Sequence, residues 1–275
     1  MKTGCIIQTR MTSSRLPGKV LLPLLVNDSK TVLEHVITRI KKAKKIDDVI
    51  IATTTNDTDL PIVEFCENHS VKYFRGSEDN VLSRYYQTAK AYNLSKIVRV
   101  TSDCPCVDWN VLDELITLHE NEKNDYTSNT LERTFPHGID AEVFDFEILE
   151  EAYLNANQKY ETEHVTPYIY KTHPDNFKIG QLKADEKRYG PEIRITLDTR
   201  EDYTLLQGVF DLLASEFTTV DIIKLFTEKP WLRGINSRIV QKKVLGTLDE
   251  ELEECISLCK TQDLLKAAKF ITEAR

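Results

Sequence analysis

A short basic segment near the N-terminus carries the densest set of phosphate-binding side chains in the sequence. Residues 8–19 contain Arg10, Arg15 and Lys19 together with several serines and threonines. Guanidinium groups bind phosphate oxygens in pairs, an ammonium adds a compact charge, and the N–H groups of a turn supply further donors. The segment therefore predicts a triphosphate site, although it is not a Walker A loop, because Val20 stands where that loop needs serine or threonine. The alternative is a solvated basic loop ahead of a helix.

Elements of alternating type must position this segment. Apolar runs alternate with helical patterns in the first hundred residues, with strands expected at residues 4–9, 48–53, 71–74 and 96–101 and helices at residues 31–43, 60–68 and 80–92. This alternation indicates βαβ crossovers and a parallel sheet. Ligands of such sheets bind at the carboxyl ends of the strands, where the loops after Thr9 and Thr101 are expected.

The rhythm changes after about residue 125. Less regularly spaced strands are expected at residues 126–129, 141–144, 177–182 and 192–197, with helices at residues 146–155, 161–171, 201–213 and 219–226. We interpret this part as a mixed-sheet insertion that covers the site. The last amphipathic stretch, residues 248–274, predicts a helical hairpin or appendage for packing or oligomer contacts, in which Cys255 and Cys259 are expected to be small buried side chains.

Composition limits the possible functions. The 275 residues are 41% hydrophobic and 29% charged, with a net charge of −8. A basic surface, the usual source of nucleic-acid affinity, is therefore not expected, whereas a local basic pocket for a small anion remains possible. No apolar run is long enough for a membrane span, and no signal peptide is recognised, so we expect a cytoplasmic protein. The six scattered cysteines fit reduced thiols better than disulfides or a zinc site.

Several longer segments resemble one enzyme family. They include IIQTRMTSSRLPGKVLLPL, FRGSEDNVLSRYYQTA, IVRVTSDCPCVD and IRITLDTREDY. These segments are similar to the cytidylyltransferases that activate sugar acids, such as the CMP-Kdo and CMP-sialate synthetases, and most to the spore-coat polysaccharide (SpsF-like) branch. The resemblance spans roughly residues 4–240. It implies an α/β, three-layer nucleotide-diphospho-sugar transferase fold (GT-A-like, Rossmann-like) with a mixed-sheet insertion and a C-terminal helical appendage. We accordingly expect a nucleotidyltransferase domain at residues 1–240 and a helical extension at residues 241–275.

The resemblance also implies an Mg²⁺-dependent reaction, in which CTP and a small anionic acceptor give a CMP-linked product and pyrophosphate. By position, the residues expected to bind CTP are Arg10, Ser14, Arg15, Lys19, Arg75 and Arg84. Arg10 and Lys19 are in addition expected to be catalytic, because cations there would neutralise the charge that develops as pyrophosphate leaves. For Arg75 and Arg84, a strand-end arginine and a helix-surface arginine are the alternatives.

Two aspartates from distant segments are the expected metal ligands and catalytic carboxylates. Asp103 follows the fourth expected strand, and Asp198 lies in the segment LDTRED. Carboxylates are the ligands that Mg²⁺ prefers, and such an ion would bridge phosphate oxygens. Asp198 capping the next helix and Asp103 in a turn are the alternatives. Asp108 is expected to be either an outer ligand of the metal or a helix cap.

The resemblance places the acceptor pocket in the segments FPHGID and TEHVTPY. The residues expected to bind the acceptor are Arg133, His137, Asp140, Glu163, His164 and Arg194. His137 stands where many members of the branch carry an acidic residue, which bears on acceptor preference. Loop or structural histidines and surface ion pairs are the alternatives for these positions.

Two other functions remain open at the level of sequence. A GT-A glycosyltransferase also uses an aspartate-held metal, but no isolated DxD motif occurs at a strand end. A catalytically silent binding protein would need no such set of charged residues. UTP, dTTP or GTP as the donor, and a homodimer as the assembly, are also compatible with the sequence.

Overall fold

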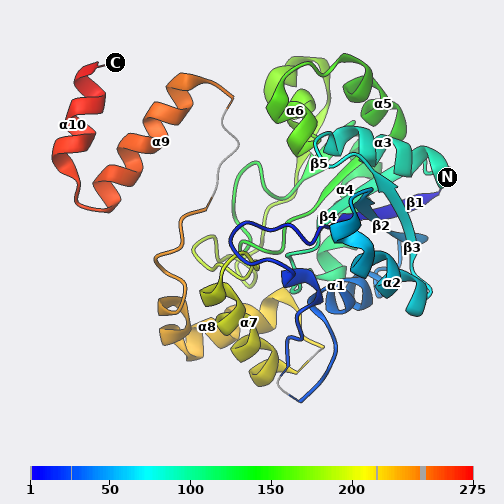
Figure 1. Ribbon diagram of the computed structural model, residues 1–275, viewed down its shortest axis with the longest axis horizontal. Coiled ribbons are helices and arrows are strands. Elements are labelled where there is room, and N and C mark those ends of the chain that lie inside the picture. Colours follow the sequence, from blue (N-terminus) through cyan, green and yellow to red (C-terminus); the bar gives the residue numbers. More distant parts are fainter. Residues whose placement is uncertain (1, 26, 215, 242–245, 275) are drawn as a thin grey trace.

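A single mixed sheet forms the middle layer of the computed structural model, which describes residues 2–25, 27–214, 216–241 and 246–274 (Figure 1). In the described residues its strand order is β3-β2-β1-β4-β6-β5-β7. The strands are β1 (Thr3–Gln8), β2 (Asp48–Thr54), β3 (Lys72–Gly76), β4 (Lys96–Thr101), β5 (Tyr126–Ser128), β6 (Glu142–Asp145) and β7 (Ile179–Gln181).

Helices cover both faces of this sheet. Those of the main domain are α1 (Val32–Ile40), α2 (Leu60–Asn68), α3 (Val81–Ala91), α4 (Trp109–Glu122), α5 (Phe146–Asn155), α6 (Lys159–His164), α7 (Arg200–Leu213) and α8 (Thr219–Glu228). Apolar side chains of α1, α2 and α4 pack on one face, and those of α3 and α5 pack on the other. Helices α7 and α8 form a third apolar cluster beside the first layer. The expected three-layer α/β fold is confirmed.

Strand alternation explains how one sheet serves two cores. In β1, Cys5 and Ile7 point into the α1–α2–α4 layer, whereas Ile6 points into the α3–α5 layer. Strands buried on both faces read as continuous apolar runs, which is why β1, β2 and β4 are recognisable in the sequence.

The first four strands are parallel, as predicted. Strand β1 lies between β2 and β4, and Gln8 at the end of β1 pairs in register with Thr101 at the end of β4. The strand order therefore reverses at β1, with β2 and β3 on one side of it and β4 on the other. Ligands of open α/β sheets bind in the crevice at the carboxyl ends of the strands where the order reverses. The loops that follow β1 and β4, which carry Lys19 and Asp103, begin at this crevice.

Two expected elements differ from the structure. Residues 192–197 form an extended segment that contributes one bridge, between Arg194 and His137, and no ladder. The helix expected over residues 161–171 is interrupted, because Val165 has a φ of 76° and Pro167 starts a separate π-helical turn, Tyr168–Thr172. Proline has no N–H for the helix, so a continuous helix through this position is disfavoured.

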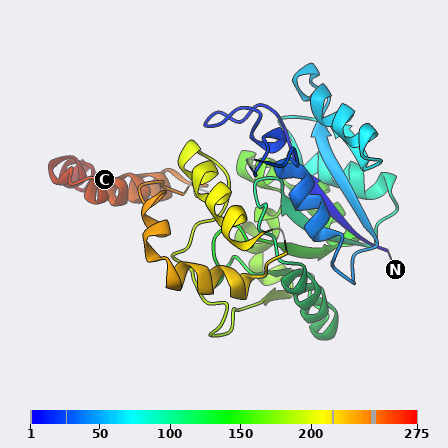
Figure 2. The ribbon, with the colours of Figure 1, turned by 90° about the horizontal axis from the view of Figure 1, so that it is seen from below.

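The expected C-terminal hairpin is present. Helices α9 (Leu248–Thr261) and α10 (Leu265–Ala274) lie side by side, apart from the main domain (Figures 1 and 2). The expectation that Cys255 and Cys259 are buried there is wrong, because Cys255 is exposed and Cys259 is half-buried. Part of the proposed boundary between the two regions, residues 242–245, lies outside the described residues. None of the helices in the described residues is long and apolar enough to cross a membrane.

Candidate active site

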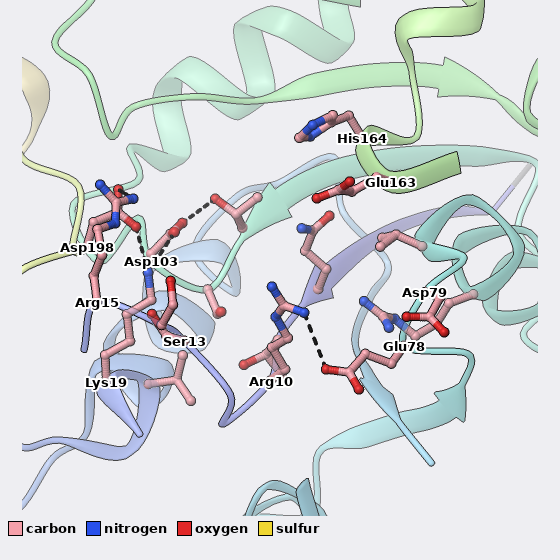
Figure 3. A pocket seen from close by; sticks show the side chains of 18 of the residues that line it. Arg10, Ser13, Arg15, Lys19, Glu78, Asp79, Asp103, Glu163, His164 and Asp198 are labelled. Atoms are coloured by element: carbon pink, nitrogen blue, oxygen red, sulfur yellow. Dashed lines mark hydrogen bonds and ion pairs between the residues drawn. The ribbon is translucent and has the colours of Figure 1, made fainter. Parts of the chain in front are cut away.

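A cavity of about 580 Å³ opens at the carboxyl ends of β1 and β4 (Figure 3). The loop after β1, the start of α3, the loop after β4 and helix α6 all contribute to its wall. Its polar lining includes Gln8, Thr9, Arg10, Ser13, Ser14, Arg15, Lys19, Glu78, Asp79, Arg84, Thr101, Ser102, Asp103, Lys159, Glu163, His164 and Asp198. Most residues expected to bind the nucleotide therefore share one cavity.

Lys19 is the centre of the charged groups in this cavity. Its Nζ lies 3.0 Å from Oδ2 of Asp103 and 2.9 Å from Oδ1 of Asp198, and it donates to the carbonyl of Leu197 at 2.5 Å. The side chain is only 9% exposed. Burial alone would lower the pKa of Lys19, but the two carboxylates outweigh it and raise the pKa, so the ammonium stays charged.

Distant segments bring the two carboxylates to this ammonium. Asp103 follows β4, and Asp198 precedes α7. The backbone N–H of Leu197 donates to the carbonyl of Asp103 at 2.8 Å, which fastens the two segments together. The helix α7 is capped by Thr199, whose hydroxyl accepts from the N–H of Asp202, so Asp198 is not needed as a cap.

Asp198 is held ionised by several cations. Arg15 lies 3.0 Å and Arg194 lies 2.9 Å from its Oδ2. Burial opposes ionisation, but Lys19 and these arginines together lower the pKa of Asp198 to about 2. The carboxylate is therefore charged at every pH at which the protein is expected to work.

A fixed turn places the basic segment over the cavity. Gly18 adopts a φ of 70°, and its N–H donates to the carbonyl of Met11 at 2.9 Å. The N–H of Met11 in turn donates to buried Asp59 at 2.7 Å. Glycine takes this left-handed conformation without strain, which lets the 3₁₀ turn Lys19–Leu21 start with its lysine directed inward.

The other arginines of the predicted nucleotide site divide into two groups. Arg10 is about half exposed at the rim, 3.4 Å from Glu78, and Arg84 is buried in the wall. Arg75 is not among the residues that line the cavity. Its guanidinium donates to the carbonyls of Thr54 and Asn56, so the geometry assigns it to supporting the loop after β2.

A second cavity of about 530 Å³ adjoins the first, and Thr101 and His164 line both. Arg133 and Asp140 line the second cavity and form a paired contact at 2.8 and 3.0 Å. Burial opposes ionisation of Asp140, but its hydrogen bonds from Arg133 lower its pKa. Both residues were expected at the acceptor site, and the structure brings them together.

Two histidines line the second cavity as neutral groups. His137 lies in its wall, with Nε2 3.8 Å from Oδ2 of Asp140, and His164 lies at the junction of the two cavities. Burial lowers the pKa of both imidazoles, which are therefore uncharged at neutral pH. They can donate and accept hydrogen bonds without adding charge.

The remaining expected acceptor residues lie elsewhere. Glu163 lines the first cavity and not the second. Arg194 lines neither cavity. Arg194 binds Asp198 and Asp202, so the structure gives it a role in holding the Asp198 carboxylate in place. Asp108 is also outside both cavities, where it caps α4 and accepts from the N–H and hydroxyl of Thr219.

Sequence reasoning missed a buried ion pair in the wall of the second cavity. Arg99 on β4 and Glu142 on β6 are cross-strand partners and form a salt bridge in the lining of the second cavity. Glu142 also accepts from the hydroxyls of Tyr126 at 2.6 Å and Thr166 at 2.7 Å. The available signal is the arginine inside the otherwise apolar run KIVRVT.

The donor set of the first cavity fits a divalent cation only with help from a substrate. Asp103 and Asp198 offer the hard carboxylate oxygens that Mg²⁺ prefers, although in this structure both contact the Lys19 ammonium. However, the described residues contain no group of three or more histidine, cysteine, aspartate or glutamate side chains that could hold a metal on its own. Phosphate oxygens would have to complete the coordination.

A protein family and several known proteins are similar to this chain over most of its length. A sequence profile of the family described as cytidylyltransferase matches residues 4–267. An uncharacterised protein of Methanocaldococcus jannaschii is 40% identical over 88% of this chain and 97% of its own length. The spore coat polysaccharide biosynthesis protein SpsF of Bacillus subtilis is 36% identical over 78% of this chain and 92% of its own length.

A solved structure shows the same arrangement of elements. A cytidylyltransferase from Leptospira borgpetersenii superposes with a TM-score of 0.79 at 33% sequence identity. The match covers 88% of this chain and all of the other chain. The likeness therefore extends over most of the fold.

Proposed function

The chain belongs to the cytidylyltransferase family of CTP-dependent nucleotidyltransferases, and we propose that it transfers CMP from CTP to a sugar acid or related anionic acceptor, releasing pyrophosphate. The observation that carries this proposal is the position of the Lys19 ammonium, bound between Asp103 and Asp198. This cluster lies at the end of β1 and β4, in a cavity that shares part of its wall with a second one. A donor and an acceptor can thus bind next to each other.

The first cavity suits the triphosphate of CTP. Arg10 and Arg15 would bind phosphate oxygens. These oxygens would replace, or share each guanidinium with, its present partner, which is Glu78 for Arg10 and Asp198 for Arg15. Lys19 would neutralise the negative charge that develops on the departing pyrophosphate. A divalent cation, when bound, would supply further charge neutralisation, with Asp103 and Asp198 holding it.

The second cavity suits an acceptor rich in hydroxyl groups. Its two guanidinium groups, on Arg99 and Arg133, each have a carboxylate partner inside the chain, and its histidines are neutral. Such a lining offers many hydrogen-bond donors and acceptors at little net charge. The acid group of the acceptor would then face the cations of the first cavity.

Transfer needs positioning more than a protein nucleophile. An acceptor oxygen attacks the α-phosphorus, a new oxygen–phosphorus bond forms, and the bond to the pyrophosphate oxygen breaks. The proton of the acceptor oxygen passes to water or to an aspartate. Holding both reactants in line accounts for much of the rate in such reactions. Cys104, beside Asp103, is not suited to be a nucleophile, because burial and the nearby Asp103 raise its pKa well above the usual value.

The relative from Bacillus subtilis carries polysaccharide biosynthesis in its name. By this likeness, we place the CMP-linked product of this chain among precursors of a surface polysaccharide. The acceptor would then be a nonulosonic or other sugar acid, or a phosphorylated small molecule.

An acceptor screen tests the proposal. The purified chain is incubated with CTP, Mg²⁺ and a panel of sugar acids, and pyrophosphate release is measured. Release with at least one sugar acid, reduced at least a hundredfold in Asp103→Asn and Asp198→Asn, is the expected result. Hydrolysis or transfer of a sugar from a nucleotide-sugar donor, with no release from CTP, would instead favour a glycosyltransferase.

A further inference from the structure

His164 lies at the point where the first cavity meets the second. It is the last residue of α6, and its side chain lines both cavities. In Figure 3 the imidazole lies on a different side of the first cavity from Lys19 and Asp103. An acceptor oxygen that approaches CTP from the second cavity has to come close to this side chain.

A strained turn sets the direction of the His164 side chain. Val165, the next residue, has a φ of 76° and a ψ of −57°, and the N–H of Thr166 donates to the carbonyl of His164 at 3.0 Å. These values define the rarer and more strained form of the γ-turn, and they are unusual for a β-branched residue. Strain of this kind persists only where the surroundings enforce it, and it is concentrated at functional sites.

The protein interior holds the turn on both sides. Before it, the buried carboxylate of Glu161 accepts from the hydroxyl of Thr172 at 2.6 Å. After it, the hydroxyl of Thr166 donates to buried Glu142 at 2.7 Å. The side chain of Val165 itself is fully buried. Packing therefore maintains the strain, and the imidazole between these anchors is held at the junction of the cavities.

The ring nitrogens of His164 are available to a substrate. The imidazole forms no hydrogen bond or ion pair with the part of the chain that the structure describes. By contrast, the ring nitrogens of His119 lie within hydrogen-bond distance of Thr127 and Asp145, as is usual for a structural histidine. His137 lines the second cavity alone, so it does not face both reactants.

Charged groups from three elements act on the His164 ring. They are Glu163 on α6, Arg99 on β4 and Glu142 on β6, and the last two offset each other in a salt bridge. Further charged groups in the lining of the two cavities include Arg84, Lys159, Arg133 and Asp140. Burial outweighs the nearby carboxylates and lowers the pKa of His164 below 6.5, so the ring is neutral at pH 7.

The carboxylates of the first cavity are poorer proton acceptors. Lys19 and the neighbouring arginines lower the pKa of Asp198 to about 2. Asp103 already accepts from Lys19 at 3.0 Å and from the hydroxyl of Thr101 at 2.5 Å. Glu163 lines the first cavity and not the second. The neutral imidazole is therefore the group best placed to take a proton from an acceptor that lies between the cavities.

We propose, on the basis of the CMP transfer proposed above, that His164 is the catalytic base of the reaction. As the acceptor oxygen attacks the α-phosphorus, its proton moves to a ring nitrogen of His164. The new oxygen–phosphorus bond forms, the bond to pyrophosphate breaks, and pyrophosphate leaves with the electron pair. The imidazolium then passes the proton to water. A positioned general base contributes about 10²–10⁴-fold to such a step.

Single-turnover kinetics with CTP and the sugar acid that gives the most pyrophosphate test this proposal. His164→Gln is expected to lower the rate by about 10²–10³-fold, because no base takes the proton. The Kd for CTP should change less than threefold. The wild-type rate should fall as the pH drops, with a midpoint below pH 6.5, since a protonated imidazole cannot act as a base. The variant should lack this fall.

Chemical rescue and a surface histidine provide the controls. Added imidazole should restore the rate of His164→Gln at least tenfold. His69→Gln, on the exposed surface after α2, should keep the wild-type rate and pH profile and should not respond to imidazole.

Two results would overturn the base while leaving CMP transfer intact. One is a His164→Gln rate within threefold of the wild type. The other is a slow variant that keeps the fall in rate at low pH and is not rescued by imidazole, as expected of a purely structural residue. A wild-type chain that releases no pyrophosphate from CTP with any acceptor would overturn the proposed function and the base together.

Discussion

At the scale of single residues, Lys19 links the charge balance of the site to its chemistry. A single ammonium binds two carboxylates that would otherwise repel each other in a poorly solvated place. When a triphosphate enters, the same ammonium can share its hydrogen bonds with phosphate oxygens, because it has three donors. The two carboxylates therefore hold the ammonium in place for phosphate oxygens although the whole chain is acidic.

Removing the Lys19 ammonium should abolish most of the activity. We expect Lys19→Met to lower kcat/KM for CTP by about 10²–10³-fold, because the charge that stabilises departing pyrophosphate is lost. Pyrophosphate release measures this effect. Lys159→Met, in the wall of the same cavity but outside the Lys19 cluster, serves as the control and should lose less than tenfold. Equal losses in the two variants would contradict a special role for Lys19.

The Arg99–Glu142 pair is expected to support the fold at the wall of the second cavity. Glu142→Gln keeps the shape of the side chain but leaves Arg99 without its anion in a buried place. Breaking one side of a buried ion pair costs about 3 kcal/mol or more. Urea unfolding should show this loss, whereas Glu147→Gln on the exposed surface of α5 should change stability by less than about 0.5 kcal/mol.

His35 should make the stability of the protein depend on pH. Burial, with a contribution from Lys30, lowers the pKa of His35 to about 4. Between pH 6.5 and about 4, His35 is protonated in the unfolded chain but stays neutral in the folded chain. The free energy of unfolding therefore falls as the pH drops through this range.

The His35 contribution to that loss is up to about 3 kcal/mol, since one pKa unit corresponds to about 1.4 kcal/mol. We expect His35→Leu to show a correspondingly smaller loss than the wild type in chemical unfolding at pH 6.5 and pH 4. Parallel pH dependences of the two proteins would exclude His35 as a cause.

At the scale of elements, the parallel strands do most of the positioning. β1 and β4 end side by side, so loops that are some ninety residues apart in the chain reach the same cavity without special contacts. This consequence of the fold could be predicted from the sequence, because strands buried on both faces are continuous apolar runs. The grouping of Arg10, Lys19 and Asp103 follows from it.

The second half of the site could be predicted less well. Residues 192–197 look like a strand, but only Arg194 forms a bridge, because the neighbouring backbone groups bond to the loops around Asp103 and His137. The sequence pattern shows that such a segment is extended and buried, and does not show its partner. For the same reason Arg194 was expected at the acceptor, whereas its ion pairs hold Asp198 and Asp202.

Gly138 controls the shape of the loop that bears the acceptor-cavity residues. It has a φ of 115°, and a Cβ would lie 2.7 Å from the backbone of Ile195. Gly138→Ala is therefore expected to cost about 2 kcal/mol of stability. It should also raise the KM for the acceptor at least tenfold while the Kd for CTP changes less than threefold.

The matched glycine is Gly208 in α7, where an added Cβ meets nothing within 4 Å. Gly208→Ala should stabilise the protein by about 0.5–1 kcal/mol and leave both constants unchanged. A Gly138→Ala variant with unchanged acceptor KM would separate this loop from the acceptor site.

At the scale of the whole molecule, the acidic chain concentrates its functional cations in one crevice. The net charge of −8 disfavours polyanions at large, and in the first cavity the five basic side chains of the lining stand beside five carboxylates, so a triphosphate would bind by exchanging hydrogen bonds with them rather than by net attraction. The second cavity shares a wall with this crevice, so one domain can hold a donor and an acceptor together. Of the described residues in the C-terminal hairpin, none lines either cavity.

The most direct test of the central claim, that the Lys19 cavity binds CTP, is calorimetric titration with CTP, UTP, GTP, ATP and dTTP in the presence of Mg²⁺ and of EDTA. We predict micromolar binding that is selective for CTP and strengthened by Mg²⁺. It should weaken in Lys19→Ala and lose its metal dependence in Asp103→Ala and Asp198→Ala. Binding of a nucleotide diphosphate-sugar by a protein indifferent to CTP would contradict the claim.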